Sequence, residues 1–194
     1  MNLLASGDAR LVRDSAGLLT VLLEQLGQIQ HAIQERGTFR CLWNYEPGSA
    51  GASPKGEDTI SDWLAEQLDL RLKPHVVIDR EIQVTRPKPT GFGTRIDLTA
   101  TSAGIHLGRV AFEAKLVDNT SLLTAIDTQL VGQYMKPAAI THGIYIVYWS
   151  DPELRKSNKH PDADALAAEL RDQAEHHLPD KQIEIVVFDI GPKT

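Results

Sequence analysis

Apolar and polar residues alternate with a period of two in two neighbouring segments, residues 95–100 and 110–116. This alternation is typical of strands that are buried on one face. In the first segment Asp97 lies on the polar face, and in the second Glu113 and Lys115 do. The residues between the segments include Ser102-Ala103-Gly104, which favours a turn. A hairpin of these strands would place Asp97, Glu113 and Lys115 on one face.

Four helices and further strands are predicted around this hairpin. The first helix begins after Asp14-Ser15 and ends at Gly37, with apolar residues at helical spacing at Leu18, Leu22, Leu26, Ile29 and Ile33. The other helices begin at residues 56–58, at Thr120-Ser121 and at Pro161, and strands are predicted at 75–84, 143–149 and 183–188. Residues 87–93 are expected to form a turn. The element order predicts an α/β fold with a mixed sheet flanked by helices.

The segment from Pro47 to Gly56 is rich in Gly, Ser, Ala and Pro, and it predicts a flexible surface loop. It divides the chain into an N-terminal helical extension (1–46), a loop (47–56) and a main domain (57–194). A chain of 194 residues is long enough for one ordinary domain with an appendage.

Composition narrows the classes of function. The formal net charge of −6 argues against a protein that coats nucleic acid nonspecifically, but not against a nuclease, because carboxylates recruit metal ions. Cys41 is the sole cysteine, which excludes a disulfide or a cysteine zinc site within one chain. No apolar run approaches the roughly 20 residues of a membrane span, so a cytoplasmic protein without membrane contact is expected.

Two carboxylates and an ammonium on one face suit a hydrolytic site with a divalent metal. Glu113-Ala114-Lys115 is the only Glu-x-Lys in the sequence; the alternative is an ordinary solvated face. Glu57 lies three residues before Ile60, on the buried side of the predicted helix, where its alternative role is to compensate the helix dipole. Gln129 lies beside the apolar stripe of the third helix, where a boundary residue is the alternative.

Residues 55–190 resemble the PD-(D/E)XK, or restriction-endonuclease-like, nuclease superfamily. The superfamily carries Asp on the second strand of a meander and (Asp/Glu)-x-Lys on the third, which match Asp97 and Glu113-Ala114-Lys115. Its helix-borne acid matches Glu57, and the Gln of its following helix matches Gln129. Two features depart from the pattern: Ile96 replaces the common Pro, and Gln129 to Tyr134 is one residue longer than the Gln-to-Tyr spacing of the RecB-like branch.

A narrower resemblance, to nuclease-like domains at the C-termini of large bacterial proteins, rests on short motifs. These are Leu42-Trp43-Asn44, Glu57-Asp58-x-Ile60-Ser61-Asp62, Gln129-Leu130-Val131-x-x-Tyr134 and His142-Gly143-Ile144-Tyr145. Some of these proteins are multidomain NTPases implicated in phage defence. The resemblance implies an effector domain that works with a larger NTPase or sensor module.

The resemblance also implies the roles of individual residues. Asp97, Glu113, the carbonyl of Ala114 and Glu57 would hold Mg²⁺ or Mn²⁺. Lys115 would orient and help deprotonate water or stabilise charge on the phosphate, and Gln129 would position Lys115 or the substrate. The candidates for phosphate contact are Arg95, Arg155, Lys156 and Lys159.

The expected activity is cleavage of double-stranded DNA, as an endonuclease rather than an exonuclease. The residues alone leave RNA open as the substrate. They also leave open a homodimer, which a nuclease that makes two cuts in a duplex usually forms. The alternative is a catalytically silent module with a nuclease fold that binds nucleic acid or docks a protein.

Overall fold

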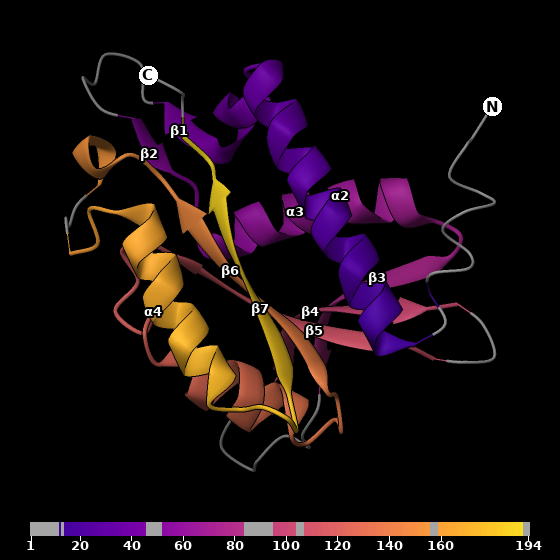
Figure 1. Ribbon diagram of the computed structural model, residues 1–194. Helices are drawn as coiled ribbons and strands as arrows, with labels where there is room; N and C mark the ends of the chain where they lie inside the picture. The colour runs from indigo at the N-terminus through magenta and orange to yellow at the C-terminus, as the bar shows by residue number, and fades with distance from the viewer. Residues whose placement is uncertain are drawn as a thin grey trace, which may run out of the picture.

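The computed structural model describes residues 12, 14–45, 52–83, 95–103, 107–155 and 159–191. Within these ranges the chain forms the helices and strands labelled in Figure 1. The α-helices are α2 (Ser15–Glu35), α3 (Glu57–Leu72) and α4 (Ala163–Glu175), and the π-helix η2 spans Ile126–Met135. Two 3₁₀ helices, η1 (Thr38–Leu42) and η3 (Pro152–Leu154), connect them to the strands. The predicted turn at residues 87–93 lies outside the described residues.

The central sheet contains five strands in the order β3-β4-β5-β6-β7. These are β3 (Val76–Gln83), β4 (Arg95–Ser102), β5 (Arg109–Leu116), β6 (His142–Trp149) and β7 (Gln182–Asp189). The first three strands form an antiparallel meander, and β5, β6 and β7 are parallel. The predicted α/β fold, a mixed sheet flanked by helices with an extra N-terminal helix, is therefore confirmed.

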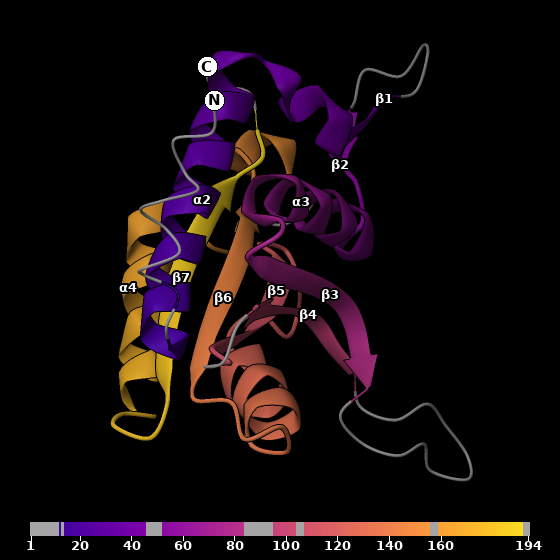
Figure 2. The same cartoon turned by 90° about the vertical axis from the view of Figure 1, so that its right-hand side faces the viewer.

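Helices cover both faces of this sheet. One face carries Leu98, Phe112 and Ile146, which share a core with α2 and α3. The other face carries Ala111 and Val147, which pack with η2 and α4. In Figure 1, α2 and α4 lie on either side of β6 and β7, and Figure 2 shows α3 beside β3. Glu113 and Lys115 alternate with Phe112 and Ala114 along β5 and so belong to the η2 face.

The N-terminal helix is continuous with the main core. The predicted cap at its start is present, since Asp14 Oδ1 accepts a hydrogen bond from Gly17 N at 2.8 Å. Near its end, Gln34 Nε2 donates to the carbonyls of Asp189 and Gly191, each at 3.1 Å. Trp43 Nε1 donates to the Ile190 carbonyl at 2.6 Å. The helix thus packs as part of the sheet domain.

The predicted loop at residues 47–56 is a loop only in part. Residues 52–54 form strand β2, which pairs antiparallel with β1 (Trp43–Tyr45), and residues 46–51 lie outside the described residues. The prediction of a loop throughout was wrong because small and polar residues also suit a short exposed edge strand, which needs only a partner backbone.

The third predicted helix differs most from expectation. It is a π-helix from Ile126, and Asn119 rather than Thr120-Ser121 organises the turn before it: Asn119 Oδ1 accepts from Ser121 N at 2.9 Å and Oγ at 2.8 Å. The Lys136 N–H bonds the Val131 carbonyl five residues earlier, the spacing that defines a π-helix. An apolar stripe read at helical spacing does not distinguish the two helix types over so short a length.

None of the helices in the described ranges combines the length and the apolar character needed to cross a membrane.

Candidate active site

The sheet register brings Asp97 and Glu113 together. Leu98 pairs with Phe112 and Thr99 with Ala111 in the β4–β5 ladder, and continuing this register by one residue places Asp97 next to Glu113. On the other side of β5, Glu113 pairs with Tyr145 of β6. Glu113 therefore lies on a strand with neighbours on both sides, beneath η2, and its exposed fraction is 0%.

Glu113 is an incompletely satisfied buried carboxylate. Neither Oε1 nor Oε2 accepts a well-aligned hydrogen bond, although the Lys115 ammonium lies against Oε1 as an ion pair. Burial, reinforced by the negative charge of Asp97 and opposed by Lys115, raises the pKa of Glu113 from 4.5 to about 8. Because a buried carboxylate normally uses its oxygens, this arrangement leaves acceptor capacity that a cation can use.

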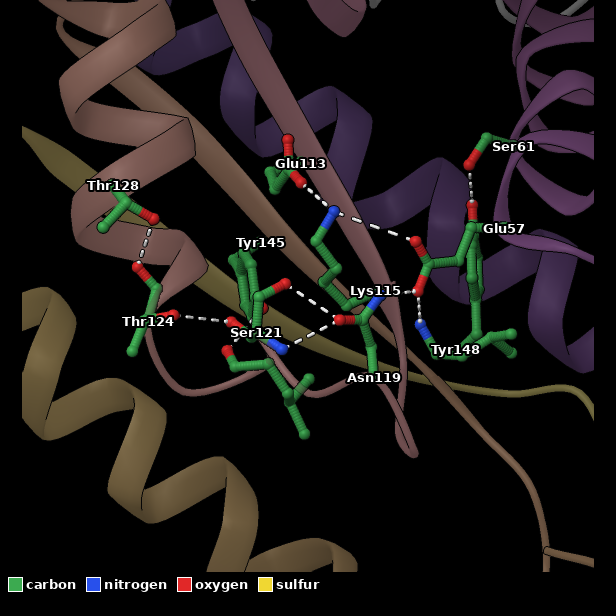
Figure 3. A network of polar contacts seen from close by, with 12 residues as sticks. Glu57, Ser61, Glu113, Lys115, Asn119, Ser121, Thr124, Thr128, Tyr145 and Tyr148 are labelled. Carbon is green, nitrogen blue, oxygen red and sulfur yellow. Dashed lines mark hydrogen bonds and ion pairs between the residues drawn. The ribbon is translucent and has the colours of Figure 1, made fainter. Parts of the chain in front are cut away.

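Lys115 lies between two carboxylates. Besides its contact with Glu113, its Nζ is 3.8 Å from Glu57 Oε2 (Figure 3). Burial acts to lower the pKa of Lys115, but the charges of Glu113, Glu57 and Asp97 outweigh it and raise the pKa above its ordinary value. Lys115 is therefore an ammonium at neutral pH, which suits charge stabilisation better than removal of a proton from water.

Glu57 faces the site from the first turn of α3, as its register predicts. Its Oε1 accepts hydrogen bonds from Leu116 N at 2.8 Å and from Asn119 Nδ2 at 2.5 Å, while Oε2 faces Lys115 (Figure 3). The structure thus joins Glu57 to the ammonium rather than to the Asp97–Glu113 pair. This geometry supports a role in holding Lys115 and gives no support to a role as metal ligand.

The donor set that remains for a divalent cation consists of Asp97, Glu113 and the backbone carbonyl of Ala114. Within the described part of the chain, no three His, Cys, Asp or Glu side chains form a ready metal cluster. Two carboxylates and a carbonyl are nevertheless the hard oxygen donors that Mg²⁺ and Mn²⁺ prefer, with water completing the shell. The unsatisfied oxygens of Glu113 are the observation that fits such an ion.

Tyr134 reaches the site from η2, whereas Gln129 shows no hydrogen bond to Lys115 among the described contacts. Tyr134 is buried, and its pKa is raised by burial and by the negative charges of Glu113 and Asp97. At helical spacing Tyr134 falls in line with Ile126 and Leu130, as one more residue of the apolar stripe. The signal that could have found it is the five-residue step from Gln129, which one turn of a π-helix spans.

Arg80 is a second residue beside the site that the sequence did not predict. From β3, its Nε donates to Asp62 Oδ1 at 2.8 Å, its Nη1 to the Asp97 carbonyl at 3.0 Å, and its Nη2 to the Asp58 carbonyl at 3.4 Å. Arg80 thereby joins the first turns of α3 to the backbone of the strand that carries Asp97. No sequence signal marks it, because a charged residue on an edge strand is ordinary.

The four candidates for phosphate contact fall into three groups. The side chains of Arg95 and Lys156 lie outside the described residues. Arg155 lies 3.8 Å above the Trp149 ring, and it donates to the carbonyls of Ser150 and His160, each at 2.6 Å, so it organises its own loop. Lys159 is exposed and lines a hollow of about 130 Å³ that also includes Asn119.

Residues 18–151 match a family model described as "Domain of unknown function (DUF8371)", and the match covers more than half of the chain. The chain belongs to this family. No curated protein and no solved structure matches it.

The DUF8371 match contains the whole candidate site. Glu57, Asp97, Glu113 and Lys115 all lie inside it, as does η2. Arg155 and Lys159, with α4 and β7, follow the DUF8371 segment. The carboxylates and the ammonium thus belong to the family segment, and the two described cationic candidates do not.

Proposed function

We propose that this DUF8371 domain is a metal-dependent nuclease that hydrolyses phosphodiester bonds of DNA, with Mg²⁺ or Mn²⁺ as its cofactor. The observation that carries the proposal is Glu113, a fully buried carboxylate with unused acceptor capacity beside Asp97 and in contact with Lys115. The order of strands and helices also matches that of the superfamily that the sequence resembles.

In this mechanism the carboxylates of Asp97 and Glu113 and the Ala114 carbonyl would hold the cation. The bound ion would lower the pKa of a coordinated water and polarise the scissile phosphate. Lys115, kept protonated by three carboxylates, stabilises the negative charge that grows on the phosphate. Glu57 holds Lys115 in place, and Arg80 fixes the backbone of Asp97.

The biological setting follows from the resemblance of the short motifs. We infer an endonuclease of the cytoplasm that acts on duplex DNA as the effector domain of a larger antiviral defence protein, with an NTPase or sensor module as its partner. A homodimer would supply the second active site that a double-strand cut requires.

Cleavage assays test the proposal directly. Plasmid DNA, linear DNA and RNA are incubated with Mg²⁺, with Mn²⁺ or with EDTA, comparing the wild type with Asp97→Ala, Lys115→Ala and the surface control Lys73→Ala. We expect metal-dependent cutting that falls at least about 100-fold in the two site variants, because each removes a charge that acts in the transition state. Lys73→Ala should cut as the wild type does.

Cutting that survives both site substitutions would contradict the proposal. A wild type that binds Mn²⁺ in calorimetry but cuts none of the substrates would instead support the catalytically silent module.

A further inference from the structure

Asn119 uses both ends of its side-chain amide at the turn that follows β5. Its Oδ1 accepts hydrogen bonds from Ser121 N and Ser121 Oγ, at 2.9 and 2.8 Å, and its Nδ2 donates to Glu57 Oε1 at 2.5 Å (Figure 3). Rotating the amide by half a turn would set Oδ1 against Glu57 Oε1 and Nδ2 against the Ser121 N–H, which replaces two of the bonds with repulsive pairs. The orientation of Asn119 is therefore fixed by its own turn, and its donor end points at Glu57.

The two donors on Glu57 Oε1 determine where the other oxygen lies. Leu116 N donates to Oε1 at 2.8 Å in addition to Asn119. The carboxylate is thus held by β5 on one side and by the turn on the other, although it belongs to α3. Its remaining oxygen, Oε2, faces Lys115 Nζ at 3.8 Å, a distance of charge attraction rather than of a hydrogen bond.

The ammonium of Lys115 has a close partner and a distant one. It lies against Glu113 Oε1, one of the two carboxylate oxygens available to the proposed cation. A divalent cation on Glu113 would repel the neighbouring ammonium. Lys115 has a flexible four-carbon stem, and the Glu57 carboxylate is the acceptor held on its other side.

We propose that Asn119 is a positioning residue that holds Glu57 as a second carboxylate for Lys115, so that the ammonium moves from Glu113 to Glu57 when Glu113 binds a divalent cation. The inference rests on the proposed metal site and adds the response of Lys115 to it. Without Asn119, Glu57 loses one of the two donors that orient it, and the displaced ammonium has no fixed acceptor beside the phosphate.

NMR of the full chain with ¹³C,¹⁵N-labelled lysine tests this movement without relying on catalysis. The Lys115 side-chain signal is assigned by its loss in Lys115→Arg and is followed during titration with Mg²⁺. In the wild type, we expect the signal to shift to a new position as Mg²⁺ binds. In Glu57→Gln and Asn119→Ala that position should not be reached, while the Kd for Mg²⁺ in calorimetry changes less than about threefold, since Asp97 and Glu113 are intact.

Asn119→Asp separates positioning from a purely structural role. Aspartate keeps the acceptor for Ser121 but replaces the donor to Glu57 with a carboxylate oxygen that repels it, so the change keeps the bonds of the turn and removes the support of Glu57. We expect Asn119→Asp and Asn119→Ala to lower kcat for DNA cleavage by about 10–100-fold with little change in KM, as losses of supporting hydrogen bonds around metal sites do. Asn44→Ala, which removes a surface bond to the Pro54 carbonyl, is the matched control and should leave both values unchanged.

The outcomes distinguish this inference from the proposed function. A wild type whose Lys115 signal shifts with Mg²⁺, but which cuts no nucleic acid, contradicts the nuclease and supports the role of Asn119. A Lys115 signal that Mg²⁺ does not move in the wild type, or that moves equally in Asn119→Asp, overturns the inference even if DNA is cut.

Discussion

A negative charge on the Glu113 side chain is costly in this fold. This side chain is fully enclosed, and the negative charge of Asp97 adds to the penalty of burial. The Lys115 ammonium offsets only part of this, since the pKa of Glu113 remains about 8. Glu113 is therefore largely protonated at neutral pH in the metal-free protein, and a cation that binds there displaces this proton.

The stability of the metal-free protein should depend on pH through Glu113. Its pKa is about 8 in the folded protein against 4.5 as the ordinary value, so the folded state binds more protons between these values. Stability is then fully present below the lower value and is lost as pH rises through the higher one. Urea unfolding in EDTA should show a falling free energy of unfolding across this window. The fall should be smaller in Glu113→Gln, and equal pH slopes in the two proteins would contradict the assignment.

The main residues of the site could be predicted from the sequence because a period of two fixes which side chains share a face. Asp97, Glu113 and Lys115 follow from that rule. Asn119, Arg80 and Tyr134 do not, because their positions depend on contacts between segments far apart in the chain. The resemblance assigned Glu57 to the metal, whereas its contacts are with Lys115, Leu116 and Asn119. The register predicts that Glu57 faces inward but not which neighbour it meets.

At the level of the element, η2 differs from an ordinary helix through one glycine. A Cβ at Gly132 would lie 2.8 Å from the Asp127 carbonyl oxygen, five residues earlier, which is closer than side-chain carbons approach backbone oxygens. The π-helix therefore needs glycine here. The prediction of a regular helix failed because apolar spacing specifies a buried stripe and not the hydrogen-bond pattern behind it.

Gly132→Ala should lower the free energy of unfolding by about 1–3 kcal/mol, because the added Cβ forces the η2 backbone away from the Asp127 carbonyl oxygen. Gly27→Ala is the matched control, because a Cβ at this exposed position of α2 meets nothing within 4 Å. That change should stabilise by about 0.5–1 kcal/mol through helix propensity. Urea denaturation measures the free energy of unfolding of both variants. Equal changes in the two would argue against a clash between a Cβ at residue 132 and the Asp127 carbonyl oxygen.

Arg80 joins α3 to β4 through its planar guanidinium group, and a lysine ammonium should not reach all of its acceptors. Arg80→Lys loses at least one of three acceptors and should cost about 1–3 kcal/mol of stability. Arg71→Lys, which affects bonds to Gln67 within α3 alone, should change stability by less than about 0.5 kcal/mol. If thermal unfolding shows the same loss of stability for Arg80→Lys and Arg71→Lys, the hydrogen bonds of Arg80 to Asp97 and α3 contribute no more to stability than those within α3.

At the level of the whole molecule, local sequence signals predict the layers and their order, but they set α2 apart as an N-terminal extension. Alternation and helical spacing are local signals, so they indicated a mixed sheet flanked by helices. Whether a helix packs on that sheet or extends from it depends on contacts between distant segments. Leu22 and Leu26 are buried with Phe112 and Phe188 in one core, so α2 is part of the domain.

Removal of residues 1–37 should therefore abolish cooperative unfolding. Loss of α2 exposes one face of the sheet at β5, β6 and β7, far more apolar surface than a single Leu→Ala change, which alone costs about 2–5 kcal/mol. Circular dichroism during urea denaturation, with dye binding to exposed apolar surface, measures the effect. A truncated chain that unfolds with the wild-type midpoint would show that α2 is an independent appendage.

The bonds from Gln34 and Trp43 to the chain around Ile190 have a consequence during synthesis. These contacts span 147 to 157 residues, so they raise the contact order of the domain. As the ribosome extends the chain from its N-terminus, α2 emerges early, while β7 emerges last. The apolar face of α2 cannot be buried until the sheet has formed. The nascent chain therefore exposes this face until translation of the domain is nearly finished.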